Sequence, residues 1–284
     1  MTMPMTAEAG RRFLAEEIRV SFNVRDPRLI DAVGSVPREQ FLPPGPWLIR
    51  GLFDTGPRQT DDADPRHVYH DVAVAIDPSR TLYNGQPSLI VKWLESLEIR
   101  EGEHVVHIGC GTGYFTAMIA SVVGPGGRVS AMDIDADLAG RAQQNLTPWP
   151  WASVRAGDGR SDLPADADVV IVHAGATHLL DEWLDALRDG GRLLVPLTGS
   201  MPGMGPTIGK GTVITARRTG DEWSVKPGAM VAIYSLVGLR DATMEAKVGQ
   251  AFLGGKWTAI RRIRRDRHAQ VESCVLHGEN CLSS

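Results

Sequence analysis

The stretch Val105-Val-His-Ile-Gly109-Cys-Gly111-Thr-Gly113-Tyr114 decides the fold of this 284-residue chain. An apolar run ends in three glycines at alternate positions, and an apolar helical pattern follows from Phe115 to Val123. This order predicts a buried strand, a tight turn and a helix. Glycine is needed where a turn takes unusual backbone angles, or where the backbone must touch a ligand. Because free N–H groups point outward from a helix N-terminus, we expect a small polar cofactor to bind here.

Two acidic residues follow the glycines at the ends of later strands. Asp133 ends a second apolar run, and Asp158 lies between Gly157 and Gly159 at the end of a third element. In an α/β sheet these positions share the crevice at the carboxyl ends of the strands. The dinucleotide-binding fingerprint is G-x-G-x-x-G, with two residues before its third glycine. Here the spacing is G-x-G-x-G, so the fingerprint is not matched. The ordered set resembles instead the S-adenosylmethionine site of Rossmann-like methyltransferases. The alternative is a glycine turn with two solvated helix-capping aspartates.

That resemblance implies a role for each part of the set. Asp133 would accept hydrogen bonds from both ribose hydroxyls, and Asp158 with its neighbouring N–H would face the adenine. The glycine turn would pass beside the amino acid end of the cofactor. The residues expected to contact S-adenosyl-L-methionine are Gln86, Ser88, His107, Gly109, Cys110, Gly111, Thr112, Gly113, Tyr114, Asp133, Ile134, Asp158 and Gly159.

The middle of the chain alternates between strand and helix patterns. Strands are predicted at 104–108, 128–132, 152–156, 168–173, 191–196 and 212–218, with helices at 113–123, 135–146 and 178–189. This alternation predicts a Rossmann-like α/β fold, with a doubly wound, mostly parallel sheet and right-handed crossovers. We divide the chain into an N-terminal helical and loop segment that packs on the core (1–100), a methyltransferase core (101–224) and a C-terminal extension (225–284).

The N-terminal segment is predicted to carry helices and long loops. The expected elements are helices at 7–24, 28–33 and 88–97, a strand at 70–77, and a surface loop at 54–67; a further loop is expected at 201–211. Asp26 before a proline is predicted to cap the second helix, and Ser88 to cap the third. The aspartates of 54–67 favour a solvated loop over a metal site, since no EF-hand spacing appears.

Composition narrows the class of protein. A formal net charge of −4 gives no general attraction to nucleic acid or to an anionic membrane, so neither is expected as a partner. No run approaches the roughly 18 apolar residues of a membrane-spanning helix, and the N-terminus lacks a signal-peptide pattern. The three cysteines are widely spread and do not suggest a disulfide framework. The simplest interpretation is a reduced, cytoplasmic protein, whose oligomeric state the sequence leaves open.

The C-terminal extension is different in character. It holds a helical pattern at 241–253, a basic run at 261–265 and an ending rich in histidine and cysteine. The basic run could bind RNA phosphates, but a charged, solvated edge is favoured. Four residues could form a zinc site, namely His268, Cys274, His277 and Cys281. Because no zinc-knuckle pattern flanks them, we favour side chains that pack or face water, and we assign no metal ligand.

Several segments, in the same order over about residues 10–235, resemble protein-L-isoaspartate O-methyltransferases. They are Asp26-Pro-Arg-Leu-Ile-Asp-Ala-Val33, Val36-Pro-Arg-Glu-Gln-Phe-Leu-Pro43, Tyr69-His-Asp-Val-Ala73, Gln86-Pro87, the glycine stretch 109–114, Gly157-Asp158-Gly159 and Gly190-Gly-Arg-Leu-Leu-Val-Pro196. The N-terminal segments are specific to this family, because other methyltransferases lack them. The resemblance implies an S-adenosylmethionine-dependent enzyme that methylates a carboxylate of a peptide or protein.

Three positions depart from the family pattern. The family loop reads T-I-S-x-P with a serine held to be central to the reaction, whereas here Gly85 stands in its place within Tyr83-Asn-Gly-Gln-Pro87. The first core strand usually ends in Glu or Asp but here ends with His107, whose neutral imidazole can still form hydrogen bonds. The histidine that follows the proline in some members is Ser88.

The candidate catalytic loop is Tyr83, Asn84 and Gly85, in which Tyr83 and Asn84 offer donors to a substrate carboxylate. The alternative is a plain Asn-Gly turn. A carboxylate acceptor is ionised at pH 7 and needs no general base. A hydroxyl or amine acceptor would need a general base, and His173 is a candidate for that role.

Two other functions stay open at this point. A methyltransferase of the same fold could act on another acceptor, such as a modified peptide or a small natural product. Gly85, in place of the family serine, favours a different acceptor. A cofactor-binding protein could instead have lost catalysis and use the C-terminal extension to bind a partner.

Overall fold

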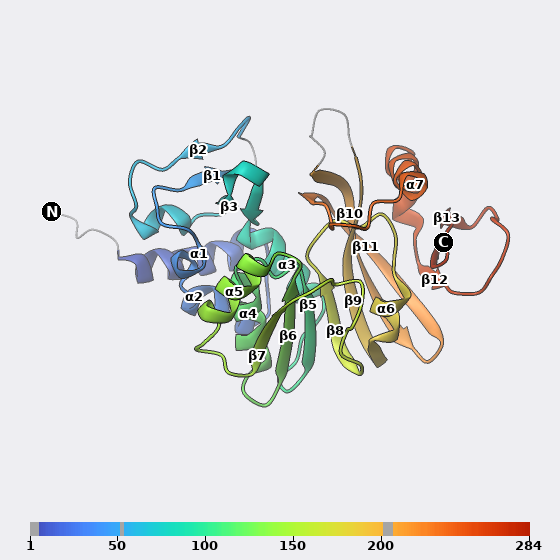
Figure 1. Ribbon diagram of the computed structural model, residues 1–284, viewed down its shortest axis with the longest axis horizontal. Helices are drawn as coiled ribbons and strands as arrows, with labels where there is room; N and C mark the ends of the chain where they lie inside the picture. Colours follow the sequence, from blue (N-terminus) through green and yellow to red (C-terminus); the bar gives the residue numbers. More distant parts are fainter. Residues whose placement is uncertain (1–5, 52–53, 201–206) are drawn as a thin grey trace. The chain divides into compact units, whose positions relative to one another are not determined.

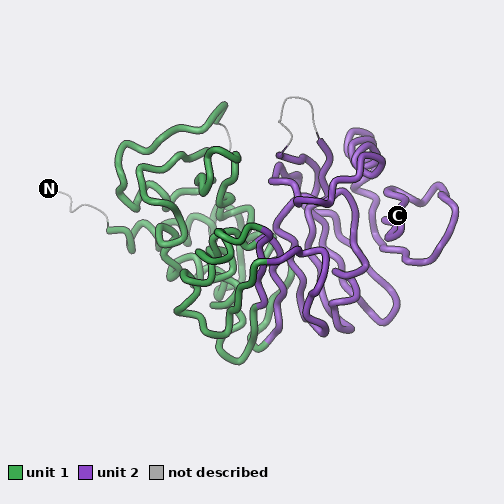
Figure 2. Tube along the Cα trace, viewed as in Figure 1, with its two compact units in different colours: residues 1–102, 110–129, 135–156 green, residues 103–109, 130–134, 157–284 purple. Residues whose placement is uncertain are grey.

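A computed structural model describes residues 6–51, 54–200 and 207–284 (Figure 1). The chain forms two compact units, which Figure 2 colours separately. Unit 1 consists of residues 1–102, 110–129 and 135–156, and unit 2 of residues 103–109, 130–134 and 157–284. The units therefore interleave along the sequence, and the three-segment division at residues 100 and 224 stays a prediction.

Unit 1 contains the N-terminal helices and a small sheet. Its helices are α1 (Ala7–Ser21), α2 (Pro27–Ser35), α3 (Pro87–Ser96), α4 (Tyr114–Val123) and α5 (Ala136–Asn145), with the short 3-10 helices η1 (Arg38–Phe41), η2 (Pro65–Val68) and η3 (Pro78–Arg80). An antiparallel sheet has the order β2 (Arg58–Gln59), β1 (Leu48–Arg50), β3 (Ala73–Asp77) and β4 (Leu82–Asn84). Val68, Val74 and Ile76 lie in the buried apolar cluster that supports this sheet.

Two expectations for unit 1 need correction. The surface loop expected at 54–67 contains β2 and the start of η2, where Asp64 caps the 3-10 helix by accepting from the Arg66 N–H. Helix α3 begins at Pro87, and Ser88 lies inside its first turn instead of capping it. The reason is that Asp71 accepts hydrogen bonds from both the N–H and the hydroxyl of Ser88, at 2.9 and 2.6 Å. The predicted cap at Asp26 is confirmed.

Unit 2 holds most of the large sheet. Its strands are β5 (His104–Ile108), β8 (Ala167–Val172), β9 (Leu187–Gly199), β10 (Ile208–Thr219), β11 (Glu222–Tyr234), β12 (Arg262–Arg264), β13 (Cys274–Leu276) and β14 (Cys281–Ser283), and its helices are α6 (Asp181–Asp185), α7 (Ala242–Leu253) and the 3-10 helix η4 (Lys256–Ala259). The ten-stranded sheet has the order β13-β14-β12-β11-β10-β9-β8-β5-β6-β7, with β6 (Arg128–Asp133) and β7 (Ala152–Ala156) completing it.

The parallel core of the sheet confirms the α/β prediction. Strands β5, β8 and β9 pair in parallel, with Val106 opposite Val170 and Val170 opposite Leu193. Their side chains are fully buried in the main apolar cluster of unit 2. Beyond β9 the pairing becomes antiparallel through β10, β11, β12 and β14 to β13. The C-terminal extension therefore continues the sheet.

The helix predicted at 178–189 is wrong over most of its length. Helix α6 covers only Asp181–Asp185, and β9 already begins at Leu187. Strand β9 has extra residues relative to β8, because Ala167 pairs with Leu187 while Val169 pairs with Arg192. The segment Asp189-Gly190-Gly191 therefore forms an irregularity within β9. Gly190, with φ +76°, permits this bend, whereas the sequence pattern indicated a turn before the strand.

Other expectations for the second half of the chain are met in part. Strand β10 starts at Ile208, so the end of the predicted loop 201–211 is wrong, and residues 201–206 lie outside the described residues. Most of the basic run forms β12, which lies between β11 and β14 and is therefore not at the edge of the sheet, contrary to the expected charged, solvated edge. Ile263 is buried, and Arg265 pairs with Asp181 and Asp185 of α6. Among the helices of 6–51, 54–200 and 207–284, none is long and apolar enough to cross a membrane.

Candidate functional site

The three glycines of the turn after β5 all adopt positive φ. The values are +77° at Gly109, +57° at Gly111 and +93° at Gly113. A residue with a Cβ is strained in this left-handed region, so each position requires glycine. Gly113 is the N-cap of α4 and provides no side chain to bond the first N–H groups of the helix. The turn is therefore built from the backbone, as the sequence pattern predicts.

Within unit 1, the turn is fixed to a neighbouring helix. The side-chain amide of Asn145, at the end of α5, donates to the Thr112 carbonyl at 2.9 Å. The Thr112 side chain is 1% exposed, and its hydroxyl oxygen has no hydrogen-bond partner within the described chain. A buried hydroxyl without a partner is unfavourable unless a ligand satisfies it. Thr112 is thus suited to contact a polar ligand at this turn.

Tyr114 is the first residue of α4, and its side chain lies in the interior of unit 1. Its ring centroid is 5.6 Å from that of Phe41, and the guanidinium carbon of Arg38 is 5.6 Å from the Tyr114 ring centroid. Burial raises the pKa of Tyr114 to about 12, so its hydroxyl is neutral. The ring packs against Phe41 and Arg38, so the backbone is the part of Tyr114 that remains for the predicted cofactor contact.

The predicted catalytic loop is held by a buried arginine. Arg38 is 0% exposed and donates to Asn84 Oδ1 at 3.1 Å, to the Gly85 carbonyl at 3.0 Å and to the Val72 carbonyl at 2.9 Å. The Asn84 side chain therefore points to Arg38 and not to solvent. Arg38 lies in the segment 36–43 that carries the family resemblance, but sequence reasoning assigned it no role.

Asp71 holds the next part of the same loop. Besides the two hydrogen bonds to Ser88, its carbonyl accepts from Nε2 of Gln86 at 3.2 Å. Gln86 and Ser88, both predicted to contact the cofactor, therefore have side chains engaged by one residue of unit 1. Asp71 also lies in a quoted segment, 69–73, whose function the sequence pattern did not reveal.

In unit 2, Asp133 ends β6 and is followed by an exposed residue. Asp133 is 9% exposed, and its carbonyl accepts from the Gly157 N–H at 2.9 Å. This bond joins the ends of the second and third predicted strands. Ile134 is 48% exposed, so an apolar side chain is available to a ligand immediately after the carboxylate.

Asp158 and Gly159 have partners that the sequence pattern did not suggest. Both carboxylate oxygens of Asp158 accept from Arg160, at 2.6 to 2.9 Å, and the Arg160 side chain lowers the pKa of Asp158. A Cβ on Gly159 would lie 2.1 Å from Cγ2 of Ile108, so this glycine is required for packing. The Gly159 carbonyl accepts from the indole of Trp183 at 2.7 Å. The predicted adenine contact of Asp158 is therefore left mainly to its backbone.

His107 and His173 form a pair of neutral imidazoles at the carboxyl ends of β5 and β8. Nε2 of His107 is 3.3 Å from Nδ1 of His173. Burial lowers the pKa of His107 well below its ordinary value, and His173 adds to the effect. Burial also lowers the pKa of His173 to about 4. The site predicted to carry an acid in the family thus carries an uncharged pair here.

Comparison with known proteins places this geometry in a family. The family described as Protein-L-isoaspartate(D-aspartate) O-methyltransferase (PCMT) matches residues 54–204, just over half of the chain. A protein-L-isoaspartate O-methyltransferase of Brucella anthropi is 30% identical over 200 residues, which cover 69% of this chain and 81% of the relative. One from Rhodopseudomonas palustris is 32% identical, with 67% and 70% covered.

Solved structures agree on the fold. A protein-L-isoaspartate O-methyltransferase structure superposes with a TM-score of 0.65 at 21% identity, covering 93% of this chain and 74% of the other. A Plasmodium falciparum structure titled as a putative member, in complex with S-adenosyl-L-homocysteine, gives a TM-score of 0.60 at 16% identity, with 80% and 97% covered. The chain belongs to the protein-L-isoaspartate O-methyltransferase family, whose members are S-adenosylmethionine-dependent O-methyltransferases.

Proposed function

We propose that this S-adenosylmethionine-dependent O-methyltransferase methylates a carboxylate of a peptide or protein, with an isoaspartyl residue as the first acceptor to test. The observation that carries the proposal is the glycine turn with three positive φ angles and the unpartnered Thr112 hydroxyl, in a chain of this family. These features suit a polar cofactor that meets the backbone closely.

We assign cofactor contacts by chemistry. The carboxylate of Asp133 suits the two ribose hydroxyls, because a carboxylate accepts two hydrogen bonds at once. The turn residues Gly109, Cys110, Gly111, Thr112 and Gly113 provide backbone groups, with Tyr114 contributing its N–H. Ile134, Asp158 and Gly159 suit the adenine, and Gln86, Ser88 and His107 the amino acid end of the cofactor. S-adenosylmethionine supplies an electrophilic methyl group on a positively charged sulfonium.

The uncharged state of the histidine pair supports both the cofactor and the acceptor class. A neutral imidazole at the end of β5 places no positive charge beside a sulfonium cofactor. His173, with a pKa of about 4, is a weak base at pH 7 and is poorly suited to deprotonate a hydroxyl or an ammonium group. A carboxylate acceptor is already ionised and needs no base.

The protein then contributes mainly by alignment. Arg38 fixes the backbone of the loop at Asn84 and Gly85, and Asp71 fixes it at Gln86 and Ser88. A loop held from both sides can present donors to a substrate carboxylate in one orientation. Correct alignment of reactants can contribute roughly 7–11 kcal/mol to lowering the barrier. Tyr83 and the backbone of Gly85 are the groups of this loop that we assign to the acceptor.

One assay tests the proposal. The purified protein is incubated with methyl-labelled S-adenosylmethionine and either an isoaspartyl peptide or the matched aspartyl peptide. Base-labile label on the isoaspartyl peptide alone is the expected result. Label on the aspartyl peptide alone would keep a peptide carboxylate as the acceptor but reject the isoaspartyl residue. Cofactor binding by calorimetry without transfer to either peptide would move the acceptor to another class. No cofactor binding at all would reject the enzymatic function.

Three free cysteines suit a reducing compartment, so we expect the protein in the cytoplasm. Cell fractionation with an antibody against the chain tests this expectation.

A further inference from the structure

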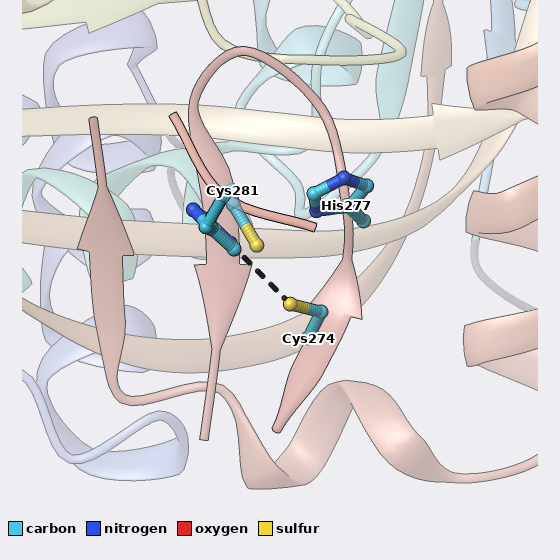
Figure 3. A group of neighbouring side chains, drawn as sticks. Cys274, His277 and Cys281 are labelled. Atoms are coloured by element: carbon cyan, nitrogen blue, oxygen red, sulfur yellow. Dashed lines mark hydrogen bonds between the residues drawn. The ribbon is translucent and has the colours of Figure 1, made fainter. Parts of the chain in front are cut away.

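The C-terminal end of unit 2 brings together two cysteines and two histidines, which we call the C-terminal cluster: His268, Cys274, His277 and Cys281. One potential ligand atom from each residue lies within 4.8 Å of all the others. Cys274 opens β13, His277 follows that strand, and Cys281 opens β14, so the spacing is Cys-x2-His-x3-Cys. Figure 3 shows the side chains of Cys274, His277 and Cys281 converging across the turn between the two strands. The sequence pattern favours side chains that pack or face water, whereas the structure gathers all four residues.

His268 is oriented as a metal-binding histidine is. Its Nδ1 donates to the backbone carbonyl of Asp266 at 2.7 Å, which leaves Nε2 as the free ring nitrogen. That Nε2 lies 3.5 Å from Sγ of Cys274. Histidines that bind metals generally donate their other ring N–H to a carbonyl or carboxylate, which fixes the tautomer and the ring direction. The loop after β12 thus aims one nitrogen at the thiol.

His277 is the second histidine of the cluster, and one of its two ring nitrogens has no hydrogen-bond partner within the described chain. That nitrogen is Nδ1, and it is buried. Its ring centroid is 5.1 Å from that of His268, in an edge-on arrangement. The backbone at His277 is held because its carbonyl accepts from the Lys247 ammonium at 2.7 Å. A buried ring nitrogen without a partner is unfavourable unless a ligand binds it.

The two thiols bring the set of potential ligand atoms to two sulfurs and two nitrogens. Cys281 is 0% exposed, and Cys274 accepts a hydrogen bond from the Val271 N–H at 3.4 Å. A tetrahedral Zn²⁺ has Zn–S bonds of about 2.3 Å and Zn–N bonds of about 2.0–2.1 Å, which place its ligand atoms about 3.3–3.8 Å apart. The distance of 3.5 Å between Cys274 and His268 already fits this range. Because the four atoms lie within 4.8 Å of one another, no separation has to close by more than about 1.0–1.5 Å.

We propose that the C-terminal cluster binds one Zn²⁺ ion as a structural site. Two sulfur and two imidazole ligands in a tetrahedron favour zinc among the common metals. Four protein ligands leave no open position, so the ion has no place for a substrate. Binding releases the two thiol protons, and the two thiolates then balance the charge of the ion. The proposal is independent of methyl transfer.

The surrounding fold gives such an ion a role. Strands β12, β13 and β14 have three residues each, and β12 is joined to β11 through one residue pair, Ser224 with Arg262. Ile263, Leu276 and Leu282 of these strands already lie in the main apolar cluster of unit 2, and an ion would add to that burial. An ion held by His268 after β12 and by the β13–β14 turn would tie all three strands together.

Metal analysis of the full chain tests the proposal. Protein purified without a polyhistidine tag is expected to carry about one zinc ion per chain. Cys281→Ser is expected to lose the zinc, whereas the matched control Cys110→Ser, at a cysteine outside the cluster, retains it. Zinc-free wild-type protein that also fails to take up added Zn²⁺ would overturn the proposal, as would full zinc content in Cys281→Ser.

A second measurement avoids dependence on the folding of a variant. Wild-type protein stripped with a chelator is titrated with Co²⁺, and the absorption bands of tetrahedral cobalt with thiolate ligands are expected, then their loss on addition of Zn²⁺. Chelator treatment is also expected to lower the melting temperature. Absence of the cobalt bands from reduced protein contradicts the site. So does a native chain lighter by two hydrogens and free of metal, because any disulfide among the three cysteines uses Cys274 or Cys281.

Discussion

Nε2 of His107 lies 3.3 Å from Nδ1 of His173, and both imidazoles are neutral at the ends of two parallel strands. One nitrogen must donate and the other accept, so the tautomer of one ring determines the tautomer of the other. The family usually places an acidic residue at the end of the first strand. Here the same position carries an uncharged hydrogen-bonding group, and this gives the protein a distinct pH response.

Stability is expected to fall as the pH drops from about 6.5 to about 4. The folded pKa values of His107 and His173 are depressed, so between these limits the unfolded chain binds protons that the folded chain does not. For His173 the loss amounts to at most about 3–4 kcal/mol. Urea unfolding at pH 7 and pH 5 measures it. His173→Gln should reduce the pH dependence, while His70→Gln, at an exposed position, should leave it unchanged. An identical slope in both variants would show that the pair does not titrate this way.

Asp133→Ala is expected to abolish detectable cofactor binding. Hydrogen bonds to a charged group contribute about 1.5–3 kcal/mol each, so losing two should weaken affinity by a factor of about 100 or more. Calorimetry with S-adenosylhomocysteine measures this. Asp137→Ala, at an exposed position in the first turn of α5, is the matched control and should bind normally. Unchanged affinity in Asp133→Ala would mean that another acid holds the ribose.

Gly85→Ser is expected to raise kcat/KM for an isoaspartyl peptide. The backbone tolerates the change, because a Cβ at Gly85 would lie 3.4 Å from Cγ1 of Ile90, which is ordinary contact. Gly85→Ala adds the same Cβ without the hydroxyl and should leave the rate close to that of the wild type. A gain of equal size in both variants would assign the effect to loop rigidity instead of the hydroxyl. No gain in either would remove Gly85 as the point of divergence.

Arg38→Met is expected to destabilise the protein by about 3 kcal/mol or more, because buried acceptors lose their donors. The carbonyls of Val72 and Gly85 and the Asn84 side chain would all be affected. Transferase activity should fall more steeply than stability alone explains, since the loop loses its anchor. Denaturant unfolding and initial rates at low temperature, where the variant stays folded, separate the two effects. Arg12→Met, on an exposed arginine, should change neither.

Much of the core was predictable from local pattern. The strand at 104–108, the glycine turn and the helix after it follow from one apolar run, three glycines and a second apolar run, and all three appear in the structure. These elements depend on backbone preferences and burial that act within a few residues. The helix at 178–189 failed because its apolar residues belong partly to β9, whose pairing with β8 overrides helical spacing.

Partners of side chains were harder to foresee. Asp158 was expected to be free for a ligand, but Arg160, two residues later, occupies its carboxylate. Ser88 was expected to cap a helix, but Asp71 binds it from 17 residues earlier. Arg38 supports the loop at 84–85 from 46 residues away. Such contacts depend on which segments the fold brings together, and no local pattern encodes that.

The sequence by itself determined the α/β core and the glycine turn, because these rest on apolar periodicity and on the conformational freedom of glycine, and the resemblance of its motifs indicated the family. Only the tertiary structure decided which polar side chains meet. It paired His107 with His173, anchored the predicted catalytic loop on Arg38 and Asp71, and gathered His268, Cys274, His277 and Cys281 within 4.8 Å. The physical reason is range: backbone preferences act between neighbours, whereas hydrogen bonds and metal ligands join residues that only the folded chain brings together.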